Sequence, residues 1–153
     1  MKGKVLAALG LPPLWLLFFI ALAWLLGAIA PWGPEPGLAL RLLGQGLIAL
    51  GVALTALALS EFRRHQTPPI PGRHAAALIR TGPFRWSRNP IYLADALMLT
   101  GAVLWMGAWL GLLLVPGFIF VLTKRFILPE EARLSTDFGE EFAAWAAATR
   151  RWL

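Results

Sequence analysis

The chain has 153 residues, of which 58% are hydrophobic and 14% charged, with a formal net charge of +6 and no cysteine. Soluble domains are about half apolar and roughly a quarter charged, so this composition indicates a membrane protein, and the length predicts a single domain over residues 1–153. The lack of cysteine excludes disulfides, thiolate metal sites and a cysteine nucleophile, and basic residues that border apolar runs are expected to meet lipid headgroups, not nucleic acid.

Four apolar segments have the length expected of membrane-crossing helices, which need roughly 20 residues. They are predicted at about residues 12–30, 40–60, 90–106 and 109–127. The first follows Lys2 and Lys4, so a cleaved signal peptide ending at Ala30 is an alternative. Its apolar stretch exceeds the ~7–15 residues of a signal peptide's apolar core, which favours a retained span.

Glycines mark two features of these spans. The second span contains Gly44, Gly46 and Gly51, which would let a neighbouring helix approach closely. No charged residue occurs from Ala96 to Thr123, which covers most of the third and fourth spans. Gly107, with tryptophans on both sides, predicts the turn that joins these spans near residues 105–109.

A further segment follows the last span at residues 129–150. Its apolar residues recur at helical spacing, namely Leu134, Phe138, Phe142 and Trp145. Gly139 interrupts this amphipathic pattern. We therefore expect an all-α, polytopic membrane protein of about four transmembrane helices plus a C-terminal amphipathic helical segment.

The distribution of charge predicts the orientation. With four spans, both termini and the loop at residues 61–89 lie on one side of the membrane. Every Lys and Arg except Arg41 falls on that side. Since cytoplasmic loops carry the excess of Lys and Arg, both termini and this loop are expected to be cytoplasmic.

The most unusual polar segment is RTGPFRWSRNPIYL at residues 80–93, where a basic loop meets the third span. Arg80 and Arg85 are explained by membrane topology alone. Arg88 differs, because it precedes an Asn-Pro step at an expected helix start. A guanidinium there could bind a carboxylate or phosphate through two parallel hydrogen bonds, and the free backbone N–H groups of a helix start also favour anions.

Three acidic residues could accompany this segment. Asp95 lies a few residues inside the third span, where it either pairs with Arg85 or Arg88 or takes part in a site. Glu130 and Glu131 stand at an expected helix start, where acidic residues complement the helix dipole.

Other kinds of site are not indicated. His65 and His74 are the only histidines and lack the spacing of metal ligands, so no metal site is expected. The chain has no glycine-rich phosphate loop and no Ser/His/acid arrangement. The residues alone therefore indicate a small helical membrane protein with a polar pocket facing the cytoplasm.

Two blocks of sequence extend this interpretation. GPFRWSRNPIY at residues 82–92 resembles the Gly-x-Tyr…Arg-His/Asn-Pro-x-Tyr signature of the isoprenylcysteine carboxyl methyltransferase and phospholipid methyltransferase families. The second half of that signature resembles RFILPEEARL at residues 125–134, followed by FGEEF at residues 138–142. The resemblance covers about residues 76–153.

The resemblance implies an integral membrane enzyme that transfers a methyl group from S-adenosylmethionine to a lipophilic acceptor from the bilayer, leaving S-adenosylhomocysteine. It implies a cytoplasmic-side cofactor pocket roofed by the C-terminal segment, with Arg88 and Arg125 as catalytic residues. The cofactor contacts that it implies are Leu78, Ile79, Phe84, Asn89, Pro90, Ile91, Tyr92 and Glu130.

The departures from the family pattern leave the acceptor open. Ala76 stands where many relatives have histidine, with His74 two positions earlier, and Phe84 replaces a common tyrosine. A carboxylate acceptor, as in isoprenylcysteine methylation, is ionised near neutral pH and needs no general base. An amine of a phospholipid headgroup would need a proton acceptor, for which Asp95 or Glu130 are candidates. A small thiol is a third candidate acceptor, and a non-catalytic scaffold or transport subunit is the competing hypothesis from a different class of protein.

Overall fold

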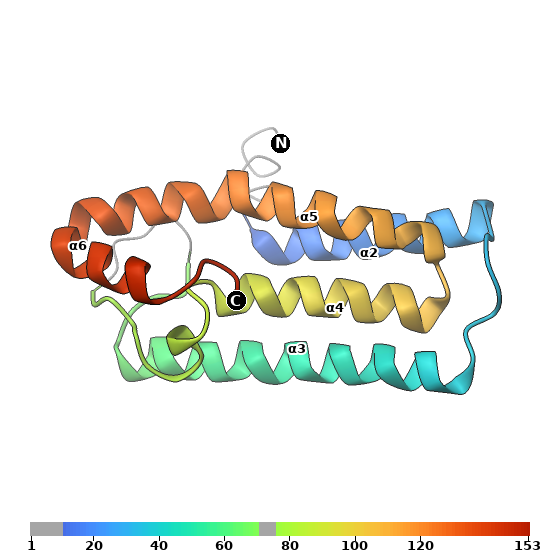
Figure 1. Ribbon diagram of the computed structural model, residues 1–153, viewed down its shortest axis with the longest axis horizontal. Coiled ribbons are helices and arrows are strands. Elements are labelled where there is room, and N and C mark those ends of the chain that lie inside the picture. Colours follow the sequence, from blue (N-terminus) through green and yellow to red (C-terminus); the bar gives the residue numbers. More distant parts are fainter. Residues whose placement is uncertain (1–10, 71–75) are drawn as a thin grey trace, which may run out of the picture.

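The computed structural model describes residues 11–70 and 76–153, and over these ranges the chain forms helices and loops without a strand (Figure 1). The expectation of an all-α fold is therefore confirmed. Lys2, Lys4 and His74 lie outside the described residues. The main helices are α2 (Pro12–Ile29), α3 (Leu38–Arg64), α4 (Pro90–Met106), α5 (Leu114–Leu122) and α6 (Leu128–Ala148).

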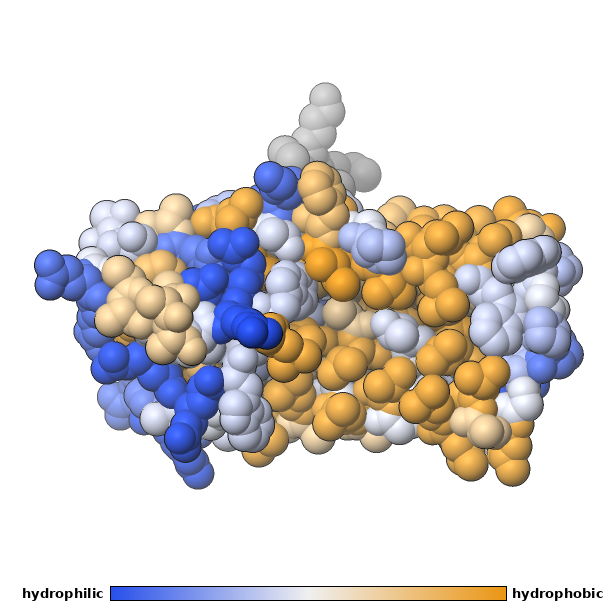
Figure 2. Space-filling view, viewed as in Figure 1, coloured by the Kyte–Doolittle hydropathy of each residue, from blue (hydrophilic) through white to orange (hydrophobic). Residues whose placement is uncertain are grey.

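Three helical stretches are long and apolar enough to cross a membrane: Pro12–Ile29, Leu38–Arg64 and Trp109–Ala148. The apolar helix α4 is shorter, with 17 residues, and lies between α3 and α5 (Figure 1). Hydrophilic residues gather at the end where α6 folds back, while apolar residues cover most of the bundle's length in this view (Figure 2). This arrangement is that of a protein embedded in a bilayer.

Helices α3 and α4 approach closely because glycines face each other along their contact. A Cβ atom at Gly101 would lie 2.5 Å from the carbonyl oxygen of Gly44, closer than real Cβ contacts allow. A Cβ atom at Gly51 would lie 2.8 Å from the carbonyl oxygen of Ala94. Gly46, in contrast, has nothing within 4 Å. Two of the three glycines of α3 thus let the neighbouring backbone approach, and the third faces away.

The turn after α4 lies where the sequence predicts it. Gly107 caps α4 in the left-handed conformation, with φ 68°, which glycine adopts without steric cost. The 3₁₀-helix η2 (Trp109–Leu113) then leads into α5. α4 and α5 consequently form a tight hairpin.

The last helical stretch is longer than expected. Helical structure continues from Trp109 through Pro129 as far as the break at Gly139, so the membrane span and the first part of the C-terminal segment are joined and not separated at Pro129. Proline interrupts an α-helix because its ring meets the carbonyl four residues earlier, and here it follows the π-helical turn η3 (Thr123–Ile127), where the α-helical register is already relaxed. The chain turns back only at Gly139, which has φ 50° and ψ −120° (Figure 1).

Candidate active site

A short 3₁₀-helix, η1 (Gly82–Arg85), leads to the start of α4 at the polar end of the bundle. Gly82 has φ 57°, and a Cβ atom there would lie 2.9 Å from Cγ of Glu61, so glycine is required both by the backbone and by the neighbour. Pro83 and Pro90 occupy first-turn positions of η1 and α4, where a missing N–H costs nothing. The sequence of this loop therefore fixes its path.

Glu61 attaches this loop to the end of α3. Its side chain is buried, at 4% exposure, and accepts a hydrogen bond from the Thr81 hydroxyl group. Arg64 donates a second hydrogen bond to the same carboxylate at 3.1 Å. A buried carboxylate needs such partners, so the contact holds the loop and α3 together.

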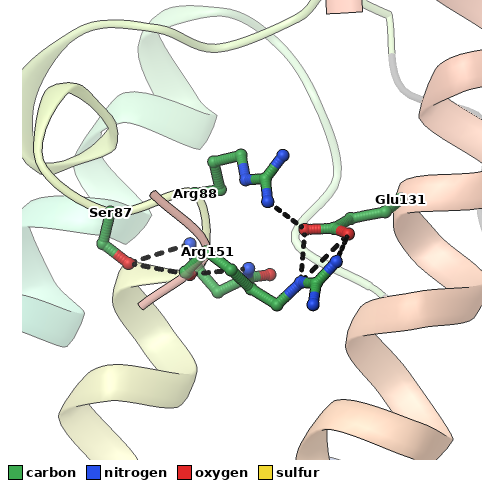
Figure 3. Close-up of polar contacts among 5 residues, drawn as sticks. Ser87, Arg88, Glu131 and Arg151 are labelled. Atoms are coloured by element: carbon green, nitrogen blue, oxygen red, sulfur yellow. Dashed lines mark hydrogen bonds and ion pairs between the residues drawn. The ribbon is translucent and has the colours of Figure 1, made fainter. Parts of the chain in front are cut away.

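The segment after α6 fixes the residues that precede α4. The backbone N–H of Arg88 donates to the carbonyl of Arg150 at 3.0 Å. The Ser87 hydroxyl and the side-chain Nδ2 of Asn89 both donate to the carbonyl of Arg151, at 3.4 and 3.1 Å (Figure 3). Residues 87–89 are thus held by backbone carbonyls more than 60 residues away in sequence.

A carboxylate and two guanidinium groups lie beside this contact, all three pointing toward one another (Figure 3). Arg88 Nη2 lies 3.2 Å from Oε1 of Glu131, and Arg151 donates three hydrogen bonds of 3.1, 3.1 and 2.7 Å to the same carboxylate. The hydrogen bond to Glu131 raises the pKa of Arg151 above its usual range. Arg88 Nε is buried without a hydrogen-bond partner.

Two cavities meet at this network. The first, of about 60 Å³, lies at the polar end between the loop and α6, and Leu78, Ile79, Phe142 and Trp145 contribute to its walls. The second, of about 290 Å³, lies between the starts of α2 and α4 and the end of α3, with Leu59 among its lining residues. Five residues line both cavities: Phe62, Phe84, Arg88, Asn89 and Glu130.

The residues expected to bind the cofactor divide between the two cavities. Leu78 and Ile79 line the first cavity alone, whereas Phe84, Asn89 and Glu130 line both. The remaining three line the second cavity alone: Pro90, Ile91 and Tyr92. The structure therefore brings all eight to one region and distinguishes a polar-end group from a group between the helices.

The two arginines expected to be catalytic lie in different places. Arg88 lines both cavities and is only 12% exposed at its side chain. Arg125 is exposed on η3, with its guanidinium carbon 5.7 Å from the ring centroid of Trp15, and is not among the residues that line these two cavities. In this conformation the structure joins Arg88, but not Arg125, to the site.

Asp95 is buried in α4 at 5% exposure, and its Oδ2 atom has no hydrogen-bond partner. The expectation that Asp95 could pair with Arg88 is wrong, because Arg88 pairs with Glu131. Asp95 also lies on the helix face that carries Tyr92 and Leu99, one turn away on either side.

Several residues of the site were not predicted from the sequence. Glu131 and Arg151 form the charge network, and Ser87, Phe142 and Trp145 complete the loop contact and the cavity wall. Glu131 is adjacent to an expected site residue, and Phe142 and Trp145 belong to the C-terminal segment that was expected to roof the pocket, so these three carried a usable signal. The contact made by Arg151 depends on the fold that returns the chain end to the start of α4.

Comparison with known proteins places the chain in a family. An uncharacterised protein of Haemophilus influenzae is 38% identical over 66 residues, which are 41% of this chain and 100% of that protein. No solved structure matches the chain significantly. Residues 40–141 match the phospholipid methyltransferase family, so the matched region begins earlier than the signature blocks and includes most of α3. Because that match covers more than half of the chain, the protein belongs to the phospholipid methyltransferase family of membrane methyltransferases.

Proposed function

We propose that this protein transfers a methyl group from S-adenosylmethionine to a lipophilic acceptor, leaving S-adenosylhomocysteine. The observation that supports this most is the pair of adjoining cavities, one at the polar end and one between membrane helices, that share Arg88, Asn89 and Glu130. A two-substrate reaction requires two binding spaces that meet where the reacting atoms meet. S-adenosylmethionine supplies an activated methyl group when bound.

The first cavity has side chains that suit this cofactor. Apolar and aromatic walls, including Leu78, Ile79 and Phe84, suit an adenine ring, and aromatic faces attract a sulfonium cation. Arg88 and Glu130 offer opposite charges for the carboxylate and the ammonium group of the methionyl part. The residues present therefore fit the cofactor in chemistry.

The first cavity is too small to hold the cofactor in the conformation described. Ligand pockets usually measure about 300–1,000 Å³, and the first cavity holds about 60 Å³. Phe142 and Trp145, which form part of its wall, lie beyond the break at Gly139. Our proposal therefore requires this second half of α6 to move outward when the cofactor binds.

The second cavity suits the tail of a lipophilic acceptor. Its walls are mostly apolar and include residues of α2, α3 and α4. The outer faces of α2 and α3 carry exposed apolar residues such as Leu17 and Leu57. A carboxylate acceptor fits the Arg88 guanidinium, and because it is already ionised the chain would need only to position it and exclude water. A prenylated cysteine or another isoprenoid acid belongs to this class.

An amine acceptor, such as an ethanolamine headgroup, is the second candidate. It would have to lose a proton to a nearby base. Glu130 lines both cavities and is therefore available for that role. Asp95, the other carboxyl group named from the sequence, lines neither cavity, although its buried Oδ2 lacks a partner. We place the site on the cytoplasmic side, on the basis of the Lys and Arg distribution.

Methyl transfer can be measured with purified protein, methyl-labelled S-adenosylmethionine and either a farnesylated N-acetylcysteine or phosphatidylethanolamine vesicles. We expect label in the organic phase, released as methanol by mild base if the acceptor is a carboxylate and retained if it is an amine. Asn89→Ala should lose most of the transfer. No cofactor binding and no transfer to either acceptor would instead favour a non-catalytic scaffold or transport subunit.

A further inference from the structure

Glu131 is shared by two arginines that hold it unequally. Arg151 makes three hydrogen bonds to its carboxylate, the shortest of 2.7 Å, while Arg88 makes one ion-pair contact of 3.2 Å. Two-pronged guanidinium–carboxylate contacts are the stronger kind. Glu131 is therefore primarily the partner of Arg151, and Arg88 is the arginine that can change partner at the smaller cost.

Arg88 is also the arginine that faces a ligand space. Its side chain lines both cavities, whereas Arg151 is not among the residues that line them. Its buried Nε atom has no hydrogen-bond partner, although a buried N–H normally has one. The guanidinium therefore has an unused donor beside the cavities and one donor in a replaceable contact with Glu131.

We propose that Arg151 is a positioning residue that keeps Glu131 from neutralising Arg88, so that Arg88 can bind a ligand carboxylate in place of Glu131. This inference rests on the proposed methyl transfer. The carboxylate belongs either to the methionyl part of the cofactor or to the acceptor. In both cases two guanidinium groups share the single carboxylate of Glu131, so Glu131 cannot neutralise both arginines at once.

Removal of Arg151 should therefore act through Glu131. Without Arg151, Glu131 pairs with Arg88 alone. A ligand carboxylate must then compete with the Glu131 carboxylate for the Arg88 guanidinium. Replacing Glu131 by glutamine removes the competing charge and should restore binding in the absence of Arg151. If Arg151 only anchored the chain end, Glu131→Gln would restore nothing, because the contact between Glu131 and Arg151 is already lost in Arg151→Ala.

Binding to the full-length protein in detergent micelles tests this with two pairs of probes. S-adenosylhomocysteine is compared with 5′-methylthioadenosine, which lacks the carboxylate, and a farnesylated N-acetylcysteine is compared with its methyl ester. In Arg151→Ala, we expect affinity to fall about tenfold for the probe whose carboxylate contacts Arg88, with the carboxylate-free partner within twofold. The affected pair identifies whether the cofactor or the acceptor supplies the carboxylate.

Three further variants make the result specific. Glu131→Gln/Arg151→Ala should return to within about threefold of wild type, and Arg151→Lys, which keeps the charge but loses the two-pronged contact, should be intermediate. Arg80→Ala is the matched control, because it breaks another arginine–glutamate contact to α6, Arg80–Glu141 at 2.8 Å, that lies outside both cavities. It should leave all four affinities unchanged.

The outcomes separate the inference from the function on which it rests. The positioning role alone is overturned if the wild type binds the probes but Arg151→Ala weakens both members of each pair equally. It is also overturned if Glu131→Gln does not restore binding in Arg151→Ala. If Arg151→Ala does not fold, the test uses Arg151→Lys and the double variant instead. The quantity compared is again the affinity for the carboxylate-bearing probe relative to its carboxylate-free partner. A wild type that binds none of the four probes overturns the proposed function, and the positioning role with it.

Discussion

The α3–α4 contact and the polar end of the bundle are held together by different forces. Along α3 and α4, Gly44 and Gly101 bring two backbones into direct contact, and no charged group is needed. At the polar end, carboxylates hold separate segments: Glu61 binds Thr81, and Glu131 binds two arginines. The first contact tolerates no added volume, whereas the second can exchange partners, and this difference separates a structural role from a functional one.

The largest expected effect is on the helix contact. Gly101→Leu would place a side chain where even a Cβ atom lies 2.5 Å from the Gly44 carbonyl oxygen, so we expect loss of folded protein, a cost of at least about 3 kcal/mol. Gly46→Leu is the control, since nothing lies within 4 Å of that position. Thermal unfolding in detergent measures both. Equal melting temperatures would contradict the contact as described.

The next largest effect is expected on methyl transfer, with little change in the stability of the fold. Arg88→Ala should lower methyl transfer by about 100-fold or more, the usual result of removing one donor from a reacting centre. The melting temperature should change little, because Glu131 keeps three hydrogen bonds from Arg151. Arg85→Ala removes an exposed arginine three residues away and should keep activity within twofold. Equal losses in the two variants would mean that net charge matters, not position.

A smaller effect is expected at the junction of the two regions. Glu61→Ala removes the carboxylate that accepts hydrogen bonds from Thr81 and Arg64, so we expect a loss of about 1–3 kcal/mol in stability and weaker cofactor binding. Ser60→Ala, one residue earlier, removes only a hydrogen bond to the carbonyl of Leu57 and should change stability by less than about 0.5 kcal/mol. Denaturation followed by tryptophan fluorescence would compare them. Indistinguishable curves would argue against the loop attachment.

The smallest effect is expected far from the site. Arg41 and Glu35 form an exposed contact of 3.4 Å at the opposite end of the bundle, and exposed ion pairs contribute about 0–1 kcal/mol. Arg41→Ala should therefore leave the melting temperature nearly unchanged and methyl transfer within twofold. A large loss of transfer in this variant would show that the two ends are coupled.

The two regions also differ in how far they could be predicted from the sequence. Apolar run lengths predict an all-helical membrane fold, and Gly107 predicts the hairpin turn, because these depend on local composition and backbone preference. The uninterrupted helix through Pro129 was not predicted, since a π-helical turn depends on packing and has no simple sequence signal. Which glycine of α3 faces α4 also requires the position of the neighbouring helix.

The candidate site was predicted where its residues are consecutive. Residues 84–92 carry most of the family signature, and the fold brings Leu78, Ile79 and Glu130 to them. The role of Arg151 could not be predicted from the sequence. Its backbone carbonyl accepts a hydrogen bond from Asn89, 62 positions away, and because every residue has a carbonyl this contact has no sequence signal. Glu61 was predicted only as the start of a basic loop, although it is buried beneath Thr81. Long-range contacts of this kind require the three-dimensional structure.

The central claim is that the two cavities hold two different substrates and meet at Arg88 and Asn89. Leu78→Trp fills the first cavity and Leu59→Trp fills the second, so binding of S-adenosylhomocysteine to each variant tests the claim most directly. We predict that Leu78→Trp loses this binding, while Leu59→Trp binds S-adenosylhomocysteine like wild type but no longer methylates a lipophilic acceptor. Loss of S-adenosylhomocysteine binding in Leu59→Trp, or normal binding in Leu78→Trp, would contradict it.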